Sequence, residues 1–193
     1  MLKKCVVLCC AAALLFTGCS HSRQIETASV IENISVEEQN GQMIYTFYPL
    51  TDSETPETVA VPAGSLQEAQ ALAERQYIPN LSLSKLELLL LHTSAIDKAL
   101  QQDIEYISTQ ASFSPSAYVA VCDTKALKII KENSGAQTTV ERQLILCKNQ
   151  NPSVNISYLA VFNCYARSSS REILLPYITA DDALKVSTVK IKQ

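Results

Sequence analysis

The sequence predicts an α+β fold, in which a mixed β-sheet begins with an N-terminal hairpin and has helices packed against it. Two observations lead to this prediction. A strong turn signal separates two apolar, strand-like segments at residues 28–37 and 42–49. Further along the chain, apolar strand-like segments alternate with segments of helical periodicity, which implies crossover connections and some parallel pairing.

The hairpin is predicted mainly from its turn residues. Asn40 and Gly41 separate the two strands, and both residue types tolerate the positive φ angles that a two-residue hairpin turn requires. The second strand is apolar on both of its faces. Residues 49–62 then combine prolines with polar and acidic residues, and we expect a surface loop there.

A helix is predicted over residues 65–76. Ser65 and Glu68 have the spacing of a capping box, in which the two side chains satisfy backbone donors of the first helical turn. The apolar residues of this segment fall on one helical face, namely Leu66, Ala69, Leu72 and Ala73. The helix is therefore amphipathic, with one side available for a core.

The densest apolar run of the chain, residues 86–91, is interrupted only by Glu87. Such a run fits a strand buried on both faces or a piece of buried helix. Its position between a predicted helix and the polar pair Thr93 and Ser94 favours a strand. We expect one of these two residues to cap a helix whose apolar spacing extends over residues 96–107.

A short β-strand is predicted at residues 118–121, followed by a third helix. Asp123 or Thr124 can cap that helix, because both side chains accept hydrogen bonds from backbone donors of the first turn. The helix is expected to stop near Gly135.

Beyond Gly135 the pattern leaves alternatives open. Residues 140–147 and 156–162 fit either a strand or a helix. Residues 168–170 are three serines and predict a loop. The apolar segment 173–178 surrounds a proline, and residues 184–191 alternate as a final strand.

The composition excludes one class of partner. The net charge is −3, and removal of Lys3 and Lys4 with an export signal would make it −5. The chain has no basic stripe, so the sequence does not predict nucleic-acid binding. Electrostatic attraction to anionic lipid headgroups is not expected either.

Catalytic and cofactor motifs are not found in the sequence. The glycines after the first apolar segment are too far apart for a phosphate-binding loop. His21 and His92 have no second histidine or cysteine at metal-ligand spacing, and His92 is expected to be structural. We therefore expect no cofactor, no metal site and no enzymatic activity.

The paired carboxylates Asp181–Asp182 and Glu37–Glu38 are interpreted as solvated turns, because Ca²⁺ would require further oxygen ligands in register. Cys122, Cys147 and Cys164 are an odd number and form no C-x-x-C pair. They are expected to be small buried apolar residues, although one pair could be oxidised outside the cell.

The N-terminus has the three parts of an export signal. Lys3 and Lys4 precede an apolar run from Cys5 to Phe16, and small residues lead to Cys19. Twelve apolar residues reach about 18 Å as a helix, against about 30 Å of bilayer hydrocarbon, so a membrane-spanning helix is disfavoured. The pattern is similar to a bacterial lipoprotein signal, and an ordinary secretory signal is the alternative.

These observations predict three segments. Residues 1–18 are a lipoprotein signal peptide, residues 19–27 are a tether, and residues 28–193 form the folded domain. The thiol of Cys19 would receive the lipid. Each buried CH₂ of an acyl chain contributes about 0.8 kcal/mol to membrane binding, so two chains hold where a single chain holds only marginally.

The order of these features resembles the N-terminal domain of the C-subunit lipoproteins of spore germination receptors, the GerAC family. The resemblance covers the chain from Cys19 to its end. Its most specific parts are the segments 81–91, 117–121 and 174–178, which look like successive buried strands of that family. The chain departs from the family pattern at Lys85, where histidine is usual, and at residues 108–113, which replace an arginine-containing segment. Family members typically continue with a second domain of comparable size.

The resemblance implies a non-catalytic subunit on the outer face of a cell or spore membrane. Its partners would be the lipid bilayer, through acylated Cys19, and integral-membrane subunits of a nutrient germinant receptor. A lipid tether would raise the effective concentration of the domain beside such partners. The alternatives are a solute-binding lipoprotein and a structural envelope lipoprotein.

Overall fold

A computed structural model describes residues 28–50, 58–110, 113–167 and 172–192. Within these residues the chain forms an eight-stranded sheet. Its principal strands, in spatial order, are β3 (Val59–Pro62), β2 (Gln42–Pro49), β1 (Ser29–Gln39), β5 (Leu88–His92), β6 (Tyr118–Cys122), β7 (Glu172–Ala180) and β8 (Leu184–Lys192). The short strand β4 (Leu81–Ser82) pairs with the start of β1.

The sheet is mixed, as predicted. Its central strands β1, β5, β6 and β7 run parallel to one another. The outer pairs β1–β2, β2–β3 and β7–β8 are antiparallel. Helices connect the parallel strands, because a parallel pair needs a crossover connection. The predicted α+β class with an N-terminal hairpin is confirmed.

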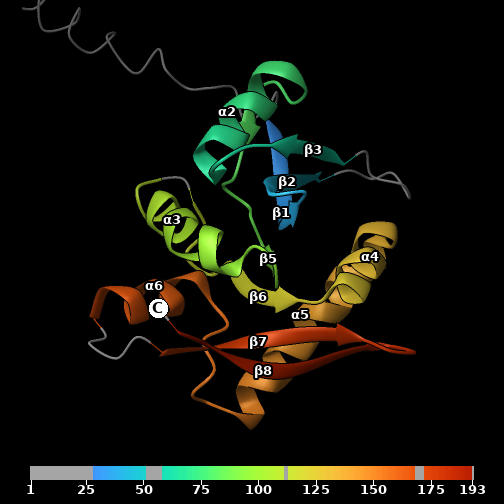
Figure 1. Cartoon of the computed structure of the whole chain (residues 1–193), viewed down its shortest axis with the longest axis vertical. Coiled ribbons are helices and arrows are strands. Elements are labelled where there is room, and N and C mark those ends of the chain that lie inside the picture. The colour runs from blue at the N-terminus through green and yellow to red at the C-terminus, as the bar shows by residue number, and fades with distance from the viewer. Residues whose placement is uncertain (1–27, 51–57, 111–112, 168–171, 193) are drawn as a thin grey trace, which may run out of the picture.

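Helices cover both faces of the sheet (Figure 1). One face is covered by α2 (Leu66–Gln76), α3 (Ile96–Ser108) and α6 (Tyr158–Arg167). The opposite face is covered by α4 (Thr124–Glu132) and α5 (Ser134–Gln150), which lie over the half of the sheet that contains β5 to β8.

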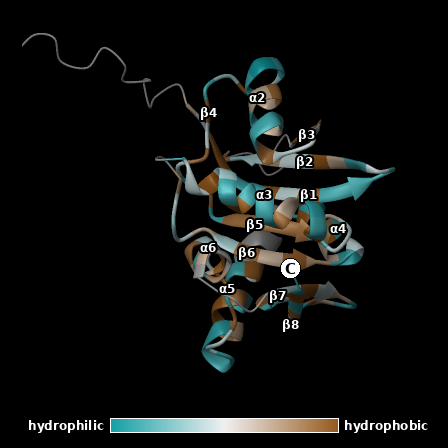
Figure 2. Cartoon of the chain, turned by 60° about the vertical axis from the view of Figure 1, so that its left-hand side comes forward, coloured by the Kyte–Doolittle hydropathy of each residue, from teal (hydrophilic) through white to brown (hydrophobic). Residues whose placement is uncertain are grey.

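Strand β5 lies between the two layers of helices, which explains its continuous apolar sequence. Leu89 and Leu91 belong to the core under α2, α3 and α6, whereas Leu88 and Leu90 belong to the core under α4 and α5. Figure 2 shows this strand as a hydrophobic band through the middle of the sheet. A strand buried on both faces loses the polar and apolar alternation of a half-exposed strand.

The hairpin prediction is confirmed in its turn and its strands. Asn40 and Gly41 have φ angles of 52° and 82°. Two successive positive φ angles are typical of the hairpin turn whose twist matches that of the flanking strands. The hairpin then pairs from Gln39 with Gln42 to Ile31 with Pro49.

The loop predicted over residues 49–62 is partly wrong. Residues 51–57 lie outside the described residues, but Val59–Pro62 forms β3 and pairs with β2. Val61 is buried in the core below this edge of the sheet. In a segment of only four residues, the alternation of inward-facing and outward-facing side chains is too short to distinguish a strand from a loop by sequence alone.

The predicted caps of α2 and α4 are confirmed. The Ser65 hydroxyl accepts a hydrogen bond from the Glu68 backbone N–H at 3.2 Å, and the Glu68 carboxylate accepts one from the Gly64 N–H at 2.7 Å. At α4, the Asp123 carboxylate accepts a hydrogen bond from the Ala126 N–H at 2.7 Å. The Ser65 and Asp123 side chains each satisfy a first-turn donor that the helix itself leaves unpaired, whereas the Glu68 carboxylate binds a donor just before the N-cap.

The predicted cap of α3 is wrong. The N-cap residue is Ala95, which makes no side-chain capping bond. The hydroxyl of Ser94 instead lies 2.7 Å from Nδ1 of His92 and accepts a hydrogen bond from the Glu38 backbone N–H at 3.0 Å. Ser94 therefore connects β5 to the end of β1.

The segments after α4 that were ambiguous in the sequence are helices, α5 and α6. The predicted helix before them ends at Glu132, so Gly135 lies inside α5 and not in a turn. The apolar segment around Pro176 is β7, and the final strand is β8 as predicted. The loop expected at residues 168–170 lies outside the described residues.

Candidate functional site

The residue with the clearest chemical role in the sequence, Cys19, lies outside the described residues. The same holds for the predicted signal peptide, residues 1–18, and for the tether, residues 19–27. The described domain begins next to that tether, where Ser29 donates hydrogen bonds to the carbonyls of Asn80 and Pro79, at 3.2 and 3.1 Å. Within the part of the chain that the structure describes, no helix is both long and apolar enough to cross a membrane.

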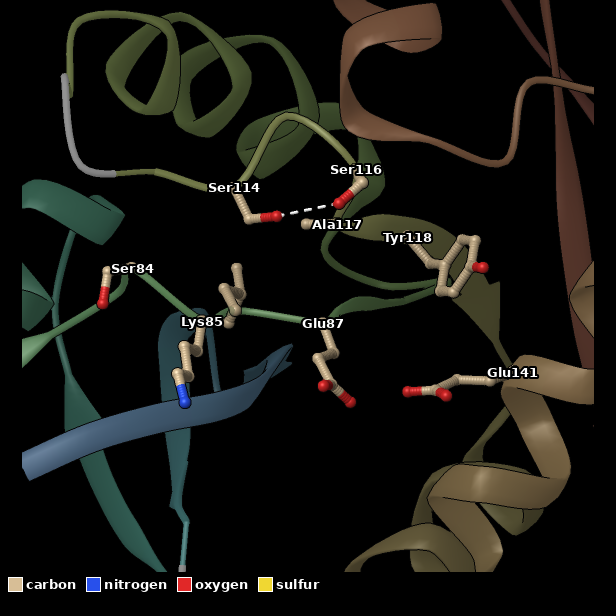
Figure 3. A pocket seen from close by; sticks show the side chains of 9 residues that line it. Ser84, Lys85, Glu87, Ser114, Ser116, Ala117, Tyr118 and Glu141 are labelled. Carbon is tan, nitrogen blue, oxygen red and sulfur yellow. Dashed lines mark hydrogen bonds between the residues drawn. The ribbon is translucent and has the colours of Figure 1, made fainter.

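A polar cavity of about 430 Å³ lies between the segment before β5, the segment that leads into β6 and helix α5. Its lining is dominated by hydroxyl and charged groups, from Ser84, Lys85, Glu87, Ser114, Ser116, Tyr118 and Glu141, together with Leu86 and Ala117. Figure 3 shows the carboxyl groups of Glu87 and Glu141 pointing toward each other, one from the β5 side and one from α5. This cavity is the candidate site.

The backbone fixes the β5 side of the cavity. The N–H of Glu87 donates to the carbonyl of Glu32 on β1, and the N–H of Tyr118 donates to the carbonyl of Glu87, each at 2.7 Å. Glu87 is thereby held between β1 and β6. On the opposite wall, the hydroxyls of Ser114 and Ser116 lie 2.9 Å apart.

The carboxyl groups of Glu141 and Glu32 are in an environment that disfavours their charged form. Burial raises the pKa of Glu141 to about 7, with further contributions from the neighbouring Glu87 carboxyl and from the charge of Glu32. Burial and the charge of Glu87 likewise raise the pKa of Glu32. Lys85 is the cation of the lining, and Figure 3 shows its side chain on the opposite side of Glu87 from Glu141.

The cavity offers proton exchange and hydrogen bonding. The lining residues described above include neither histidine nor cysteine, so no nucleophile is paired with an imidazole base there. Among the described residues there is also no group of three or more His, Cys, Asp or Glu side chains that could hold a metal ion. A carboxyl that titrates near pH 7 is the distinctive chemical feature of the site.

His92, which the sequence marks as structural, lies away from this cavity's lining and joins β5 to α4. Its Nδ1 accepts a hydrogen bond from the Ser94 N–H at 3.2 Å, and its Nε2 lies 3.0 Å from the Thr124 hydroxyl. Since Nδ1 is an acceptor, Nε2 carries the proton and donates to Thr124. The histidine therefore has partners on both nitrogens.

The two carboxylate pairs differ from each other. Asp181 and Asp182 are exposed at the turn between β7 and β8, as predicted. The interpretation of Glu37 and Glu38 as a solvated turn is wrong. Both residues lie in β1, and their side chains form ion pairs with Lys131 of α4 and with Lys98 of α3. The reason is that the strand continues to Gln39, which brings these carboxylates beside the helices on each face.

The three cysteines of the described domain are free thiols. Cys122 and Cys147 are buried and Cys164 is half-buried, in line with the expectation of small apolar residues. Burial also raises the pKa of Cys122 to about 12, which keeps this thiol protonated and unreactive at neutral pH.

The sequence did not predict that the carboxyl groups of Glu87 and Glu141 meet in a cavity. Glu87 gave the one available signal, because it is the single charged residue in the apolar run 86–91. Glu141 lies in a segment whose secondary structure was ambiguous. Only the fold brings the two residues together across more than fifty positions of sequence.

Comparison with known proteins identifies the family. No curated protein and no solved structure gives a match to the chain. A family model described as the spore germination protein N-terminal domain matches residues 21–180, which include every helix and all strands of the described sheet except β8. The match indicates a role related to spore germination. The chain therefore belongs to the family of the spore germination protein N-terminal domain.

Proposed function

We propose that the chain is a membrane-anchored, non-catalytic lipoprotein subunit of a spore germinant receptor. Acylated Cys19 would hold it on the outer face of the cell or spore membrane, beside integral-membrane subunits that respond to nutrients. The observation that carries this proposal is the position of the family match, which begins at residue 21, two residues after Cys19.

The length of the predicted tether would keep the folded domain close to the membrane. Nine residues, 19–27 with the lipidated Cys19 included, would precede the first described position, Ala28. An extended chain spans at most about 3.3–3.6 Å per residue, so such a tether reaches about 30 Å. The domain would thus remain within one domain diameter of the bilayer, where its effective concentration beside membrane partners is high.

The anchor is tested by Cys19→Ala in the full-length chain expressed in a spore-forming host. We expect loss of labelled palmitate incorporation and release of the protein from the membrane fraction. Cys10→Ala is the matched control, because it replaces another cysteine of the same N-terminal segment and should leave lipidation intact. If Cys19→Ala remains membrane-bound and labelled, the lipoprotein assignment is wrong.

The receptor role is tested separately, by purification of the tagged protein from spore membranes. We expect integral-membrane germination subunits to copurify with the wild type and to be lost or reduced with Cys19→Ala. A deletion strain should respond more slowly to its nutrient germinants. Isolation of the protein alone, together with a normal nutrient response of the deletion strain, would reject the receptor role while leaving the anchor intact.

A solute-binding lipoprotein is the second candidate, and the cavity is the observation that favours it. Its volume of about 430 Å³ lies in the range of small-ligand sites. A ligand that binds only the folded chain raises its melting temperature, by an amount that corresponds to about 2.7 kcal/mol at a concentration of 100 Kd. This role predicts such a shift with at least one member of a panel of amino acids, sugars and nucleosides. The absence of any shift across the panel would count against it.

A further inference from the structure

We propose that the carboxyl groups of Glu32, Glu87 and Glu141 form a proton-operated latch. The latch holds α5 against the β1–β5 region of the sheet while it retains a proton, and it loosens α5 when that proton is lost. The inference goes beyond membrane anchoring and receptor assembly, and it can be tested on the isolated protein.

Three separate parts of the fold bring acidic residues close to one another. Glu32 comes from β1, Glu87 from the residue before β5, and Glu141 from α5. The interaction of Glu141 with both other carboxyl groups raises its pKa, and Glu87 does the same to Glu32. The three groups are thus electrostatically coupled, although they are far apart in sequence.

A backbone irregularity places Glu32 in this group. Ile31 pairs with Pro49 and Asn33 pairs with Tyr48, so Glu32 is an extra residue in β1 at a β-bulge. Bulges redirect side chains and interrupt the alternation of a strand. The carbonyl of Glu32 also accepts the hydrogen bond from the Glu87 N–H at 2.7 Å, which ties the two residues together through the backbone.

The cations around Glu141 do not form ion pairs with it in the described structure. Lys85 lines the same cavity, but its side chain lies on the opposite side of Glu87 from Glu141 (Figure 3). On α5 itself, Arg142 is exposed and Lys148 donates to the carbonyls of Pro152 and Val154, at 2.6 and 2.7 Å. Tyr118 is the remaining titratable group of the lining.

Several charged side chains on the neighbouring elements are already engaged in ion pairs. These ion pairs are Lys128 with Glu132 and Lys131 with Glu37 on the α4 side, and Lys185 with Asp181 and Lys190 with Glu172 on the β7–β8 side. Among the described residues, no ion pair joins a lysine or arginine to Glu32, Glu87 or Glu141, and in the proposed latch a proton supplies the missing counter-charge.

The direction of the effect follows from proton linkage. The closed state holds Glu141 with a pKa of about 7, above the ordinary value of 4.5. A group whose pKa is raised in the closed state stabilises that state at low pH, and this contribution is lost as the pH rises through the raised pKa. If the carboxyl of the open state titrates at its ordinary value, opening becomes about tenfold more frequent between pH 6 and pH 8.

The movement is expected to be local, because other contacts hold α5. Val140 and Leu144 are fully buried in the core, and the Gln143 side chain donates to the Leu184 carbonyl on β8 at 3.0 Å. Loss of the proton would therefore loosen the side of α5 that carries Glu141, next to the cavity. The β8 side would stay attached.

Hydrogen exchange of the full chain in detergent micelles tests the latch at pH 6 and pH 8. After correction for the intrinsic pH dependence of amide exchange, we expect α5 peptides of the wild type to lose about tenfold protection at pH 8. Glu141→Gln should remove this dependence, because the glutamine amide has no proton to lose. Glu132→Gln is the matched control and should behave as the wild type, since the Glu132 side chain is 65% exposed on the neighbouring helix.

Two results would overturn the proposal. One is equal corrected protection of wild-type α5 at both pH values, and the other is an unchanged pH dependence in Glu141→Gln. If Glu141→Gln does not fold, as judged by circular dichroism, Glu87→Gln replaces it, because removal of that charge should also lower the pH dependence of α5. An undiminished dependence in the folded Glu87→Gln variant would reject the latch.

Discussion

The carboxylate of Asp103 accepts hydrogen bonds from the hydroxyl of Tyr45, at 3.1 and 3.3 Å, in the core between α3 and β2. The same carboxylate accepts a hydrogen bond from the Leu66 N–H at 3.0 Å, at the first turn of α2. Asp103 is only 1% exposed. A single side chain thus joins a strand and two helices, with its charge placed at the positive end of α2.

Asp103 predicts a pH-dependent stability. Burial raises its pKa to about 6, although its hydrogen bonds with Leu66 and Tyr45 act in the opposite direction. Since the folded-state pKa lies above the unfolded value, this group's contribution is fully present at low pH and declines as the pH rises from about 4 to about 6. The difference of roughly two pKa units corresponds to about 3 kcal/mol.

Urea denaturation of Asp103→Asn measures this contribution. The asparagine oxygen can still accept hydrogen bonds, but it does not ionise, so the variant should lose the decline between pH 4 and pH 7. Asp97→Asn, at an exposed position in the first turn of the same helix, is the control and should keep the wild-type pH profile. A wild-type profile in Asp103→Asn would contradict the assignment.

Removal of the carboxyl group altogether should be more damaging. Asp103→Ala leaves the Tyr45 hydroxyl and the Leu66 N–H without this acceptor. An unsatisfied buried polar group costs about 1–3 kcal/mol, so we expect the free energy of unfolding at pH 5 to fall by at least this amount. A loss smaller than about 0.5 kcal/mol at pH 5 would show that water or another group replaces the carboxylate.

The central strand predicts a large packing effect. Leu90 has no exposed surface and lies in the core under α4 and α5. Leu90→Ala should lower the free energy of unfolding by about 2–5 kcal/mol, through lost burial and the cavity left behind. Leu159→Ala on α6, where the leucine is 48% exposed, is the matched control and should change stability by less than about 1 kcal/mol. Equal effects at both positions would contradict the described core.

At the hairpin turn, the cost of placing a side chain at a positive φ angle can be measured separately from the cost of steric contact with neighbouring atoms. Gly41 has a φ of 82°, and a Cβ atom added there would have no neighbour within 4 Å. Gly41→Ala should therefore destabilise the fold by about 1–2 kcal/mol through left-handed strain alone. In Gly64→Ala, the added Cβ would lie 3.2 Å from the flexible end of Glu68, at a position without such a φ. Thermal unfolding should show the larger loss for Gly41→Ala, and the reverse order would contradict the turn geometry.

The cap of α4 predicts the effect of one side chain. Asp123→Ala removes the acceptor of the Ala126 N–H and should cost about 1 kcal/mol. Asp123→Asn keeps an acceptor and should recover most of this loss. Thr93→Ala changes one of the two residues expected to cap α3, which the structure instead begins after Ala95, and should leave helical content unchanged. Circular dichroism during urea denaturation distinguishes the three variants.

Local sequence was sufficient wherever a short-range interaction determines the structure. Asn40 and Gly41 specify a turn through their own φ angles, and Ser65 and Asp123 cap helices through donors three residues away. The uninterrupted leucines of β5 specify burial on both faces of a sheet. The resemblance to germination lipoproteins also depended on these local patterns and on their order.

The tertiary structure decided what depends on distant partners. The short strand β3 exists because Val59 and Val61 meet the edge of β2, and residues 140–147 are helical in a segment whose own pattern fits both states. The cavity likewise depends on residues that are distant in sequence. The sequence does not indicate that Glu32 and Glu141 lie near Glu87, and the raised pKa values of Glu32 and Glu141 arise only when the bulge in β1 and the packing of α5 bring these residues together. Charge interactions depend on distance in space and on burial, and neither quantity is encoded in sequence spacing.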